Sequence, residues 1–310
     1  MSRGLRGRDL LSVQDLTAEE VREVLDLARH LKREHRAGLS HELLRGKTVA
    51  LLFEKPSLRT RVTFEVGMRQ LGGYAVYLAP QDVQLGVRET VPDVARNLAR
   101  WVDGIIARVN RHATLVELAE AAAIPVVNAL SDFEHPCQAL GDLLTVQEKV
   151  GTLSGVRAAW VGDGNNVCHS FLLAASRVGM WVTVATPPGY GPDPAVVAAA
   201  QAEAARWGGQ VRVLTDPVQA VAGAQVVYTD VWTSMGQEAE REERQRAFRA
   251  YQVNAELLSH ADPHAVVLHC LPAHRGEEIT DEVLDGPHSA VLDQAENRLH
   301  VQKAVLSCVL

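Results

Sequence analysis

The sequence predicts an α/β protein of two doubly wound domains, each a mostly parallel sheet flanked by helices. Three observations lead to this fold class. Short apolar runs alternate with stretches of helical periodicity, which is typical of parallel strands joined by covering helices. A polar, glycine-bearing stretch at 148–154 interrupts the alternation and marks a domain boundary. The 310 residues, of which 47% are hydrophobic and 22% charged, are enough for two such domains.

The first half of the chain contains apolar runs that predict strands and periodic stretches that predict helices. In the helix expected over 12–36, Thr17 and Glu20 have the spacing of a capping box, and the apolar stripe that follows is core packing. The stretch 79–90 is polar and has no period, so we expect a long functional loop. The expected strands are 48–53, 74–78, 104–109 and 125–129, and the other expected helices are 57–71, 91–102 and 115–122.

An anion-binding turn is predicted where the first strand leads into the next helix. Pro56 and Ser57 suit the first positions of a helix, because proline leaves no N–H unpaired there and a serine oxygen caps free N–H groups. The helix N-terminus attracts anions, and Arg59 and Thr60 add guanidinium and hydroxyl donors. We interpret residues 57–61 as a phosphate cradle; the alternative is a solvated basic first turn.

Two further strand ends of the same predicted sheet carry polar side chains. Arg108 lies at the end of one strand, and the loop after the next brings His135 and Gln138 to a helix start at Pro136. Ligands of parallel sheets bind at the carboxyl ends of the strands, so we expect these side chains beside the cradle. The alternatives are a salt-bridged surface arginine and a structural histidine. We interpret Cys137 as an ordinary small apolar residue.

The second half of the chain repeats the alternation. Gly162 and Gly164 follow its first strand at the spacing of a dinucleotide-binding fingerprint, but Val167 replaces the third glycine, and the next strand runs into Thr186 and two prolines instead of an acidic residue. We therefore do not expect NAD. The expected strands are 158–161, 181–185, 211–214, 225–229 and 265–269, and the expected helices are 167–178, 194–207, 217–222 and 238–250.

Three strand-exit loops of the second half offer partners for a small polar ligand. Asn166 follows the first strand, Asp230 and Ser234 follow the fourth, and Cys270 follows the fifth. An acid, a hydroxyl and backbone N–H groups complement the ammonium and carboxylate of an amino acid. Cys270 is either a buried or a reactive thiol, and the residue pattern leaves both open.

Composition limits the classes of partner and compartment. A net charge of −7, with no basic tract, argues against a nucleic-acid partner. The four cysteines form no CxxC pair, so neither a zinc knuckle nor a disulfide framework is expected, and a reducing cytoplasm fits. The arginine-rich first residues are not followed by the apolar core of a secretory leader, and no stretch is apolar enough to span a bilayer.

Four motifs stand along the chain: 57–61, His135-Pro136-Cys137-Gln138, Asp230 with Ser234-Met235-Gly236, and His269-Cys270-Leu271-Pro272. In order and spacing, over nearly the whole chain, they resemble those of the ornithine carbamoyltransferases. The first two belong to the wider aspartate/ornithine carbamoyltransferase superfamily, and the last two are characteristic of the ornithine branch. Leu58 departs from the threonine common at that position, where a backbone N–H contributes. Gln84 stands where aspartate carbamoyltransferases place a lysine from a neighbouring subunit.

This resemblance implies transfer of a carbamoyl group from carbamoyl phosphate to L-ornithine, giving L-citrulline and phosphate in arginine metabolism, including arginine biosynthesis. It implies no cofactor and no metal, and a homotrimer or a multiple of trimers. It further implies a carbamoyl phosphate-binding domain of residues 1–148, completed by a C-terminal helix at 290–310 that begins near Glu296, and an ornithine-binding domain of residues 149–289. Related alternatives are transfer to another amine, such as putrescine, and a non-catalytic ligand-binding paralogue.

The resemblance also assigns residues to each substrate. Cys270 lies near the ornithine amine and acts with Asp230 when that amine loses its proton. The counterparts that surround carbamoyl phosphate are Ser57, Leu58, Arg59, Thr60, Gln84, Arg108, His135, Pro136, Cys137, Gln138, Cys270, Leu271 and Arg298. Those that bind ornithine are Asn166, Asp230, Ser234 and Met235. The expected catalytic residues are Arg59, Arg108, His135, Gln138 and Cys270.

Overall fold

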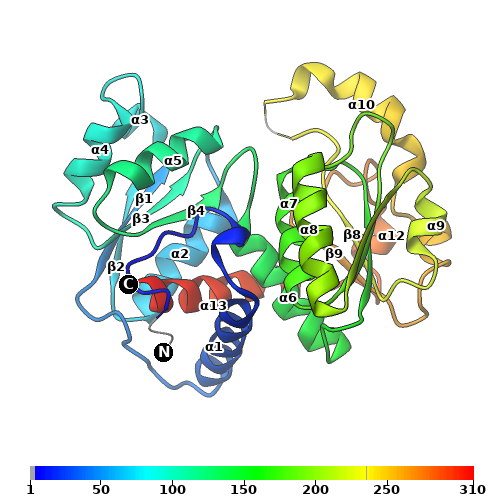
Figure 1. The fold of residues 1–310 in the computed structure, drawn as a ribbon, viewed down its shortest axis with the longest axis horizontal. Helices are drawn as coiled ribbons and strands as arrows, with labels where there is room; N and C mark the ends of the chain where they lie inside the picture. Colours follow the sequence, from blue (N-terminus) through cyan, green and yellow to red (C-terminus); the bar gives the residue numbers. More distant parts are fainter. Residues whose placement is uncertain (1–3, 235) are drawn as a thin grey trace. The chain divides into compact units, whose positions relative to one another are not determined.

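The structure is a computed structural model that describes residues 4–234 and 236–310 (Figure 1). The chain forms two compact units. Unit 1 consists of two segments, the chain up to Gly141 and Asn297–Leu310. Unit 2 is Asp142–Glu296. The two boundaries between the units both lie inside helices, the first in α6 (Pro136–Val150) and the second in α13 (Val291–Val309). The predicted functional domains, divided at 148 and 290, stay a prediction.

Unit 1 is built on a four-stranded parallel sheet in the order β2-β1-β3-β4. The strand order reverses at β1, so β1 and β3 form a switch point, and Phe53 at the end of β1 pairs with Arg108 at the end of β3. The strands are β1 (Thr48–Phe53), β2 (Tyr74–Leu78), β3 (Gly104–Arg108) and β4 (Val126–Leu130). The helices lying wholly in unit 1 are η1 (Val13–Asp15), α1 (Ala18–Arg36), α2 (Leu58–Gln70), α3 (Pro80–Val83), α4 (Val91–Leu98) and α5 (His112–Ala121).

The start of the chain differs from the single helix expected over 12–36. Ser12 and Asp15 form one capping box around the 3-10 turn η1, and Thr17 and Glu20 form a second that begins α1. Two caps five residues apart terminate one element and start another, so the predicted helix start at residue 12 is wrong and the predicted Thr17 cap is confirmed. The loop expected over 79–90 contains the short helix α3.

Unit 2 is built on a five-stranded parallel sheet in the order β7-β6-β5-β8-β9. Its switch point lies between β5 and β8. The strands are β5 (Arg157–Val161), β6 (Trp181–Ala185), β7 (Gln210–Leu214), β8 (Val226–Thr229) and β9 (Val266–His269). The helices lying wholly in unit 2 are α7 (Asn166–Arg177), α8 (Pro194–Trp207), α9 (Pro217–Val221), η2 (Glu238–Glu240), α10 (Arg241–Phe248), η3 (Arg249–Tyr251), α11 (Ala255–Leu258) and α12 (Asp281–Leu284).

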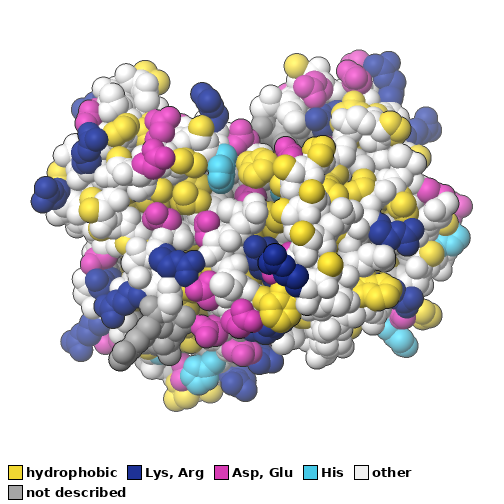
Figure 2. Space-filling model, in the orientation of Figure 1, with side chains coloured by type: hydrophobic (Ala, Val, Ile, Leu, Met, Phe, Trp, Pro, Cys, Tyr) yellow, Lys and Arg dark blue, Asp and Glu magenta, His cyan; other side chains and the backbone are white. Residues whose placement is uncertain are grey.

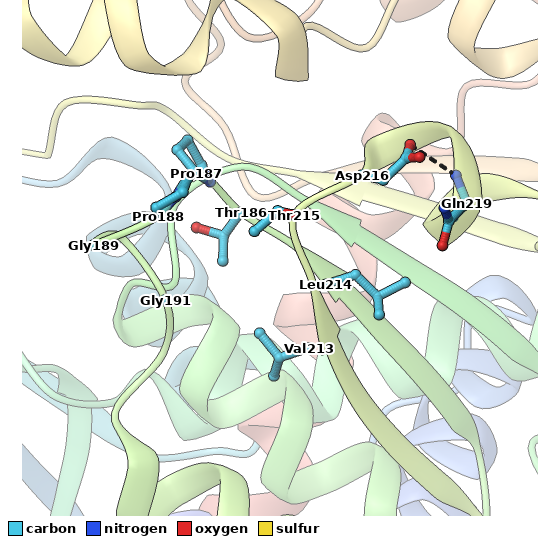
Figure 3. A pocket seen from close by; sticks show the side chains of 10 residues that line it. All are labelled: Thr186, Pro187, Pro188, Gly189, Gly191, Val213, Leu214, Thr215, Asp216 and Gln219. Atoms are coloured by element: carbon cyan, nitrogen blue, oxygen red, sulfur yellow. Dashed lines mark hydrogen bonds between the residues drawn. The ribbon is translucent and has the colours of Figure 1, made fainter.

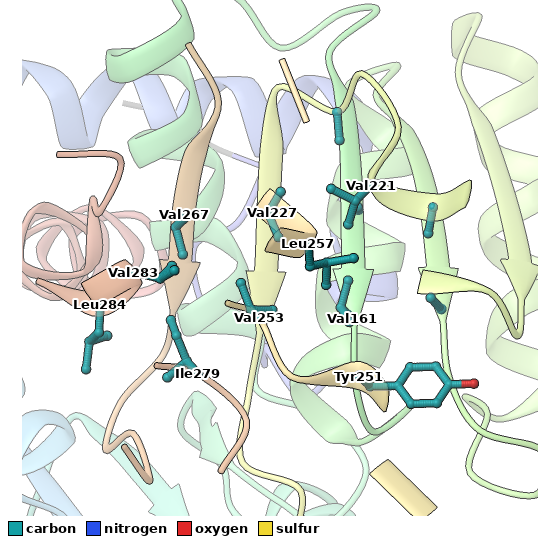
Figure 4. Close-up of a cluster of buried hydrophobic side chains, with 14 of the residues drawn as sticks. Val161, Val221, Val227, Tyr251, Val253, Leu257, Val267, Ile279, Val283 and Leu284 are labelled. Atoms are coloured by element: carbon teal, nitrogen blue, oxygen red, sulfur yellow. The ribbon is translucent and has the colours of Figure 1, made fainter. Parts of the chain in front are cut away.

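One cluster of the unit 2 core is largely aliphatic along the sheet. Figure 4 shows Val161, Val227 and Val267, from neighbouring strands, directed toward Leu257 and Val283. The helix expected over 238–250 is three consecutive pieces, and α11 and α12 were not predicted because four-residue helices show no periodicity. The last helix, Val291–Val309, agrees with the range 290–310 expected for it, and only the start expected near Glu296 is wrong.

The two-domain parallel fold class is confirmed, and so is the return of the last helix to the first unit. Within unit 1, the Lys32 Nζ of α1 donates to the Asn297 Oδ1 of α13 over 2.6 Å. No described helix combines the length and apolar character needed to cross a membrane. On the face shown in Figure 2, Lys and Arg side chains are interspersed with Asp and Glu rather than gathered in one tract.

Candidate active site

The N-terminus of α2 follows β1 at the switch point of unit 1. Ser57 is the N-cap, and its side chain accepts the Thr60 N–H over 3.3 Å. The hydroxyl of Thr60 accepts in turn from Nη2 of Arg298 over 2.9 Å. Leu58 is 75% exposed, and its backbone N–H lies in the first helical turn, where N–H groups have no partner within the helix.

His135 lies in a cluster of guanidinium groups in unit 1. Its ring is 3% exposed, and burial followed by the positive charges of Arg298, Arg108 and Arg59 holds its pKa well below 6.5. The imidazole is therefore neutral at neutral pH and donates from one nitrogen only. The structure thus brings Arg59, Arg108, His135 and Arg298 together, with Thr60 held by Arg298.

This arrangement suits an anion with a polarisable carbonyl. Three guanidinium groups stand beside a helix N-terminus, and both features stabilise phosphate oxygens. A neutral imidazole in a water-poor site can donate to an oxyanion that forms during reaction. The cluster can hold charge at both ends of an acyl phosphate.

The first turn of α6 supplies the next group of predicted residues. Pro136 begins the helix, and Cys137 and Gln138 are buried. Burial raises the pKa of Cys137 to about 12, which makes its thiol unreactive. Among these residues only Gln138 offers a side-chain amide to a ligand.

Gln84 occupies a different place in unit 1. It caps α3 with a left-handed backbone, φ 49°, which is uncommon for a residue other than glycine. It lines a groove of about 280 Å³ with Phe53 and Glu54, at the end of β1. Such backbone outliers cluster at ligand clamps, so this groove extends the candidate site along the β1 end.

Lys55 was missed in the sequence-based site. It stands in the loop between β1 and α2, where burial followed by the charge of Arg108 lowers its pKa. A cation at this position adds to the positive potential around the cradle. Its place directly before Pro56 on a strand-exit loop was the signal that could have identified it.

Asp230 is the centre of the candidate site in unit 2. Cys270 Sγ donates to Asp230 Oδ1 over 3.0 Å, and Asn165 Nδ2 donates to Oδ2 over 2.8 Å. The amide of Asn165 therefore holds the Asp230 carboxylate, while its own oxygen caps α7. Asn166, which is predicted to bind ornithine, is the first residue of that helix. The loops after β5, β8 and β9 thus meet at the switch point of the sheet.

The Cys270 loop is fixed by a buried histidine. Nδ1 of His269 accepts the Leu271 N–H over 2.9 Å, so Nε2 carries the proton and donates to Glu278 over 3.0 Å. Leu271 has φ 59°, a strained backbone that persists only where the surroundings over-determine it. The carbonyls of Cys270 and Leu271 are therefore held in one orientation.

Arg244 of α10 forms hydrogen bonds that hold the loop after β8. The sequence did not identify this residue as part of the site. Its Nη1 donates to the Trp232 carbonyl over 2.9 Å and to Asp163 Oδ2 over 3.1 Å. Burial raises the pKa of Asp163 to about 6, although Arg244 opposes the shift. Ser234 lies in this loop, with its N–H bonded to Gln237 Oε1, and the predicted ligand residue Met235 lies outside the described residues.

Two groups of described side chains place possible metal ligands close together. They are Asp230 with His269 and Cys270, and His274 with Glu277 and Glu278. In the first, both nitrogens of His269 already take part in hydrogen bonds, and the thiol donates to Asp230. We interpret the two groups as hydrogen-bond networks.

Unit 2 has another groove at the ends of β6 and β7, of about 490 Å³ (Figure 3). It is lined largely by backbone and small side chains between Thr186 and Gly191. Its one lining carboxylate, Asp216, accepts the N–H groups of Val218 and Gln219 at the start of α9. We do not assign this groove to the active site.

Models of two domain families match the chain. The aspartate/ornithine carbamoyltransferase carbamoyl-P binding domain matches residues 8–148. The aspartate/ornithine carbamoyltransferase Asp/Orn binding domain matches residues 154–309. Together they cover most of both units.

Whole proteins match along nearly their full length. The ornithine carbamoyltransferase of Carboxydothermus hydrogenoformans is 57% identical over 98% of both chains. The solved ornithine carbamoyltransferase of Pyrococcus furiosus superposes with a TM-score of 0.96 at 56% identity, over 98% of this chain and 97% of that one. That of Thermus thermophilus has a TM-score of 0.86 at 52% identity, over 96% and 97%. The chain therefore belongs to the aspartate/ornithine carbamoyltransferase family and, within it, to the ornithine carbamoyltransferases.

Proposed function

We propose that this chain transfers the carbamoyl group from carbamoyl phosphate to the side-chain amine of L-ornithine, forming L-citrulline and phosphate. The observation that carries the proposal is the cluster of Arg59, Arg108 and Arg298 around a neutral His135, beside the N-terminus of α2. A phosphate dianion and a carbonyl that becomes an oxyanion need these two kinds of donor side by side.

Carbamoyl phosphate is held by unit 1 in this proposal. Arg59, Arg108 and the first turn of α2, from Ser57 to Thr60, bind the phosphate, with Arg298 completing the pocket. His135, Thr60 and Arg108 polarise the carbonyl. Gln138 and the carbonyls of Cys270 and Leu271 orient the carbamoyl amide, and Gln84, Pro136 and Cys137 line the site.

Ornithine is held by unit 2. Asp230 and Ser234 bind its α-amino group, Asn166 its α-carboxylate, and Met235 lines the pocket. The attacking amine is normally protonated near neutral pH, and an ammonium has no lone pair with which to attack. Cys270 donates to Asp230 in the structure, and these two groups together accept the proton that the amine loses.

Holding both substrates in line supplies much of the acceleration. The amine nitrogen forms a bond to the carbamoyl carbon, and the bond from that carbon to the phosphate oxygen breaks. Phosphate leaves with the electron pair, stabilised by the guanidinium cluster. The reaction needs no covalent enzyme intermediate.

We further propose a homotrimeric assembly. On α2, Leu58, Val62 and Val66 are 75%, 45% and 37% exposed, and their spacing of four places them on one face. The edge strand β2 adds Tyr74 and Val76, 67% and 38% exposed. Exposed apolar side chains on a helix and on an edge strand of the same unit are typical of an interface between copies. We place the enzyme in the cytoplasm, in arginine biosynthesis.

The test is ureido product formation by the purified protein from carbamoyl phosphate and each of four amines: ornithine, putrescine, aspartate and N-acetylornithine. Turnover confined to ornithine is the expected result, because Asp230 addresses an amino acid head group that putrescine lacks. Equal turnover with putrescine would overturn the roles of Asp230, Ser234 and Asn166. Tight carbamoyl phosphate binding without turnover would identify a non-catalytic paralogue.

A further inference from the structure

A buried carboxylate that the mechanism does not use joins the two strands that carry Asp230 and Cys270. Asp142, fully buried on α6, accepts the Tyr228 hydroxyl at Oδ2 over 2.9 Å. Its Oδ1 accepts from Nε2 of Gln294 over 2.7 Å, and Oε1 of Gln294 accepts the backbone N–H of His269 over 2.9 Å. One oxygen therefore leads to β8 and the other to β9.

The sheet ladder ends at the residues that this network reaches and does not pair Asp230 with Cys270. The last paired residues of β8 and β9 are Thr229 and His269, and Asp230 and Cys270 lie one residue beyond them. The N–H of His269 donates to the Gln294 side chain of α13. The 3.0 Å contact between Cys270 Sγ and Asp230 Oδ1 thus depends on how Tyr228 and His269, the strand residues that the network bonds to, are held.

The network is buried and packed among aromatic rings. Tyr228, His269 and Gln294 are 0%, 0% and 1% exposed, and the Tyr228 ring packs 4.6 Å from that of Trp160 and 5.2 Å from that of Phe171. Burial, then the charge of Asp142, raises the pKa of Tyr228 well above 10, so its hydroxyl remains a donor. The N–H of His269 is likewise always a donor, so the orientation of the Gln294 amide is fixed.

We propose that Asp142 is a positioning residue that sets the spacing of the β8 and β9 ends and thereby the contact between Cys270 and Asp230. It touches neither substrate in the proposed reaction. Its effect reaches ornithine through the pair that accepts the amine proton. This inference rests on the proposed function only in its kinetic consequence, because the thiol contact itself can be followed without turnover.

The direction of the hydrogen bonds gives a decisive test. In Asp142→Asn, each orientation of the new amide loses a hydrogen bond of the original network. Either its N–H meets the amide N–H of Gln294, and turning Gln294 over moves the conflict to the His269 N–H, or its N–H faces the Tyr228 oxygen and the Tyr228 hydroxyl proton loses its acceptor. In Gln294→Glu, two carboxylates face each other. The double variant Asp142→Asn with Gln294→Glu restores every pair. Its new amide at position 142 donates to the new carboxylate at position 294 and still accepts from Tyr228.

Two readouts apply to these three variants. The first is the rate at which iodoacetamide alkylates Cys270 in ligand-free protein, where the other three cysteines are buried. The carboxylate of Asp230 disfavours a neighbouring thiolate, so each single variant should be alkylated at least about threefold faster. The second is steady-state kinetics: each single variant should raise the ornithine KM by about tenfold and weaken carbamoyl phosphate binding less, because the residues of unit 1 hold the phosphate.

The double variant should return both readouts to within about twofold of the original chain. A double variant no better than the worse single variant would overturn the proposal, and so would single variants whose alkylation rate is unchanged. If no variant or parent turns over ornithine, the alkylation rates still decide the proposal, so its failure and that of the proposed function are distinguishable.

A milder pair of variants guards against misfolding. Tyr228→Phe removes only the hydroxyl that bonds to Asp142, and Tyr251→Phe removes a hydroxyl that bonds to the Thr215 carbonyl elsewhere in unit 2. Tyr228→Phe should speed alkylation of Cys270 and raise the ornithine KM, whereas Tyr251→Phe should change neither. Equal effects of the two variants would show a general loss of stability and contradict the proposal.

Discussion

At the scale of single residues, the site depends on groups whose charge the surroundings set. His135 is kept neutral by burial and by Arg298, Arg108 and Arg59, so it can donate to an oxyanion without adding charge. In unit 2, the carboxylate of Asp230 accepts hydrogen bonds from the Cys270 thiol, the Asn165 amide and the backbone N–H of Val231. These bonds hold both of its oxygens in place. Each half of the chemistry thus has its own preset donor or acceptor.

The depressed pKa of His135 predicts a pH-dependent stability. Below 6.5 the unfolded histidine takes up a proton that the folded one does not, so stability is full above pH 6.5 and falls as the pH drops from 6.5 toward the folded pKa. The loss should approach about 1.4 kcal/mol per pH unit. Urea unfolding at pH 7.5 and 5.5 should show this slope in the original chain and a reduced one in His135→Gln. Identical slopes would contradict the assignment.

The contact between Cys270 and Asp230 predicts a substrate-selective defect. Cys270→Ser keeps a donor to Asp230 but replaces the thiol beside the ornithine amine, so the ornithine KM or kcat should change more than the affinity for carbamoyl phosphate. Steady-state kinetics with each substrate varied in turn measure this. Equal effects on both substrates would remove Cys270 from the amine side of the site.

At the scale of elements, the N-terminus of α2 lies at the proposed phosphate site, and Ser57 caps this helix. Apolar runs with turn residues on both sides predicted the strands β1, β2 and β6 at their exact bounds. Short helices such as α11 were missed because four residues carry no period. Sequence patterns therefore predicted strands that have turn residues on both sides. The shortest helices depend on packing, which the local sequence does not show.

The cap of α2 gives a prediction with a matched control. Ser57→Ala removes the oxygen that accepts the Thr60 N–H, and Thr17→Ala removes the equivalent cap of α1. Both variants should lower the free energy of unfolding by about 1 kcal/mol. Only Ser57→Ala should also weaken carbamoyl phosphate binding, as measured by calorimetry. Equal binding in the two variants would separate the cap from the ligand site.

At the scale of the whole molecule, the two units carry different kinds of group. The sequence could predict the guanidinium cluster of unit 1, because Arg59, Arg108 and His135 all stand at strand exits of one sheet. It could not predict Arg244 beside Asp163, since 81 residues separate them and Arg244 belongs to no motif. Arg298 was expected only from the family resemblance, because nothing local marks a buried arginine on the last helix.

The proposed trimer predicts the mass of the particle in solution. Light scattering should give three times the 33.7 kDa chain, or a multiple of that value. Val62→Lys places a charge in the apolar stripe of α2 and should dissociate the particle, whereas Val218→Lys, at a site 42% exposed on unit 2, should not. A monomeric original chain, or equal dissociation by both variants, would refute this interface.

The central claim is that unit 1 binds carbamoyl phosphate and unit 2 binds ornithine. The most direct measurement is calorimetric titration of carbamoyl phosphate, without ornithine, into the original chain, Arg59→Ala and Asp230→Asn. We predict that Arg59→Ala weakens binding at least about tenfold. Asp230→Asn should bind within about twofold of the original chain, because its carboxylate serves the other substrate. Equal weakening by both variants, or unchanged binding in Arg59→Ala, would contradict the account.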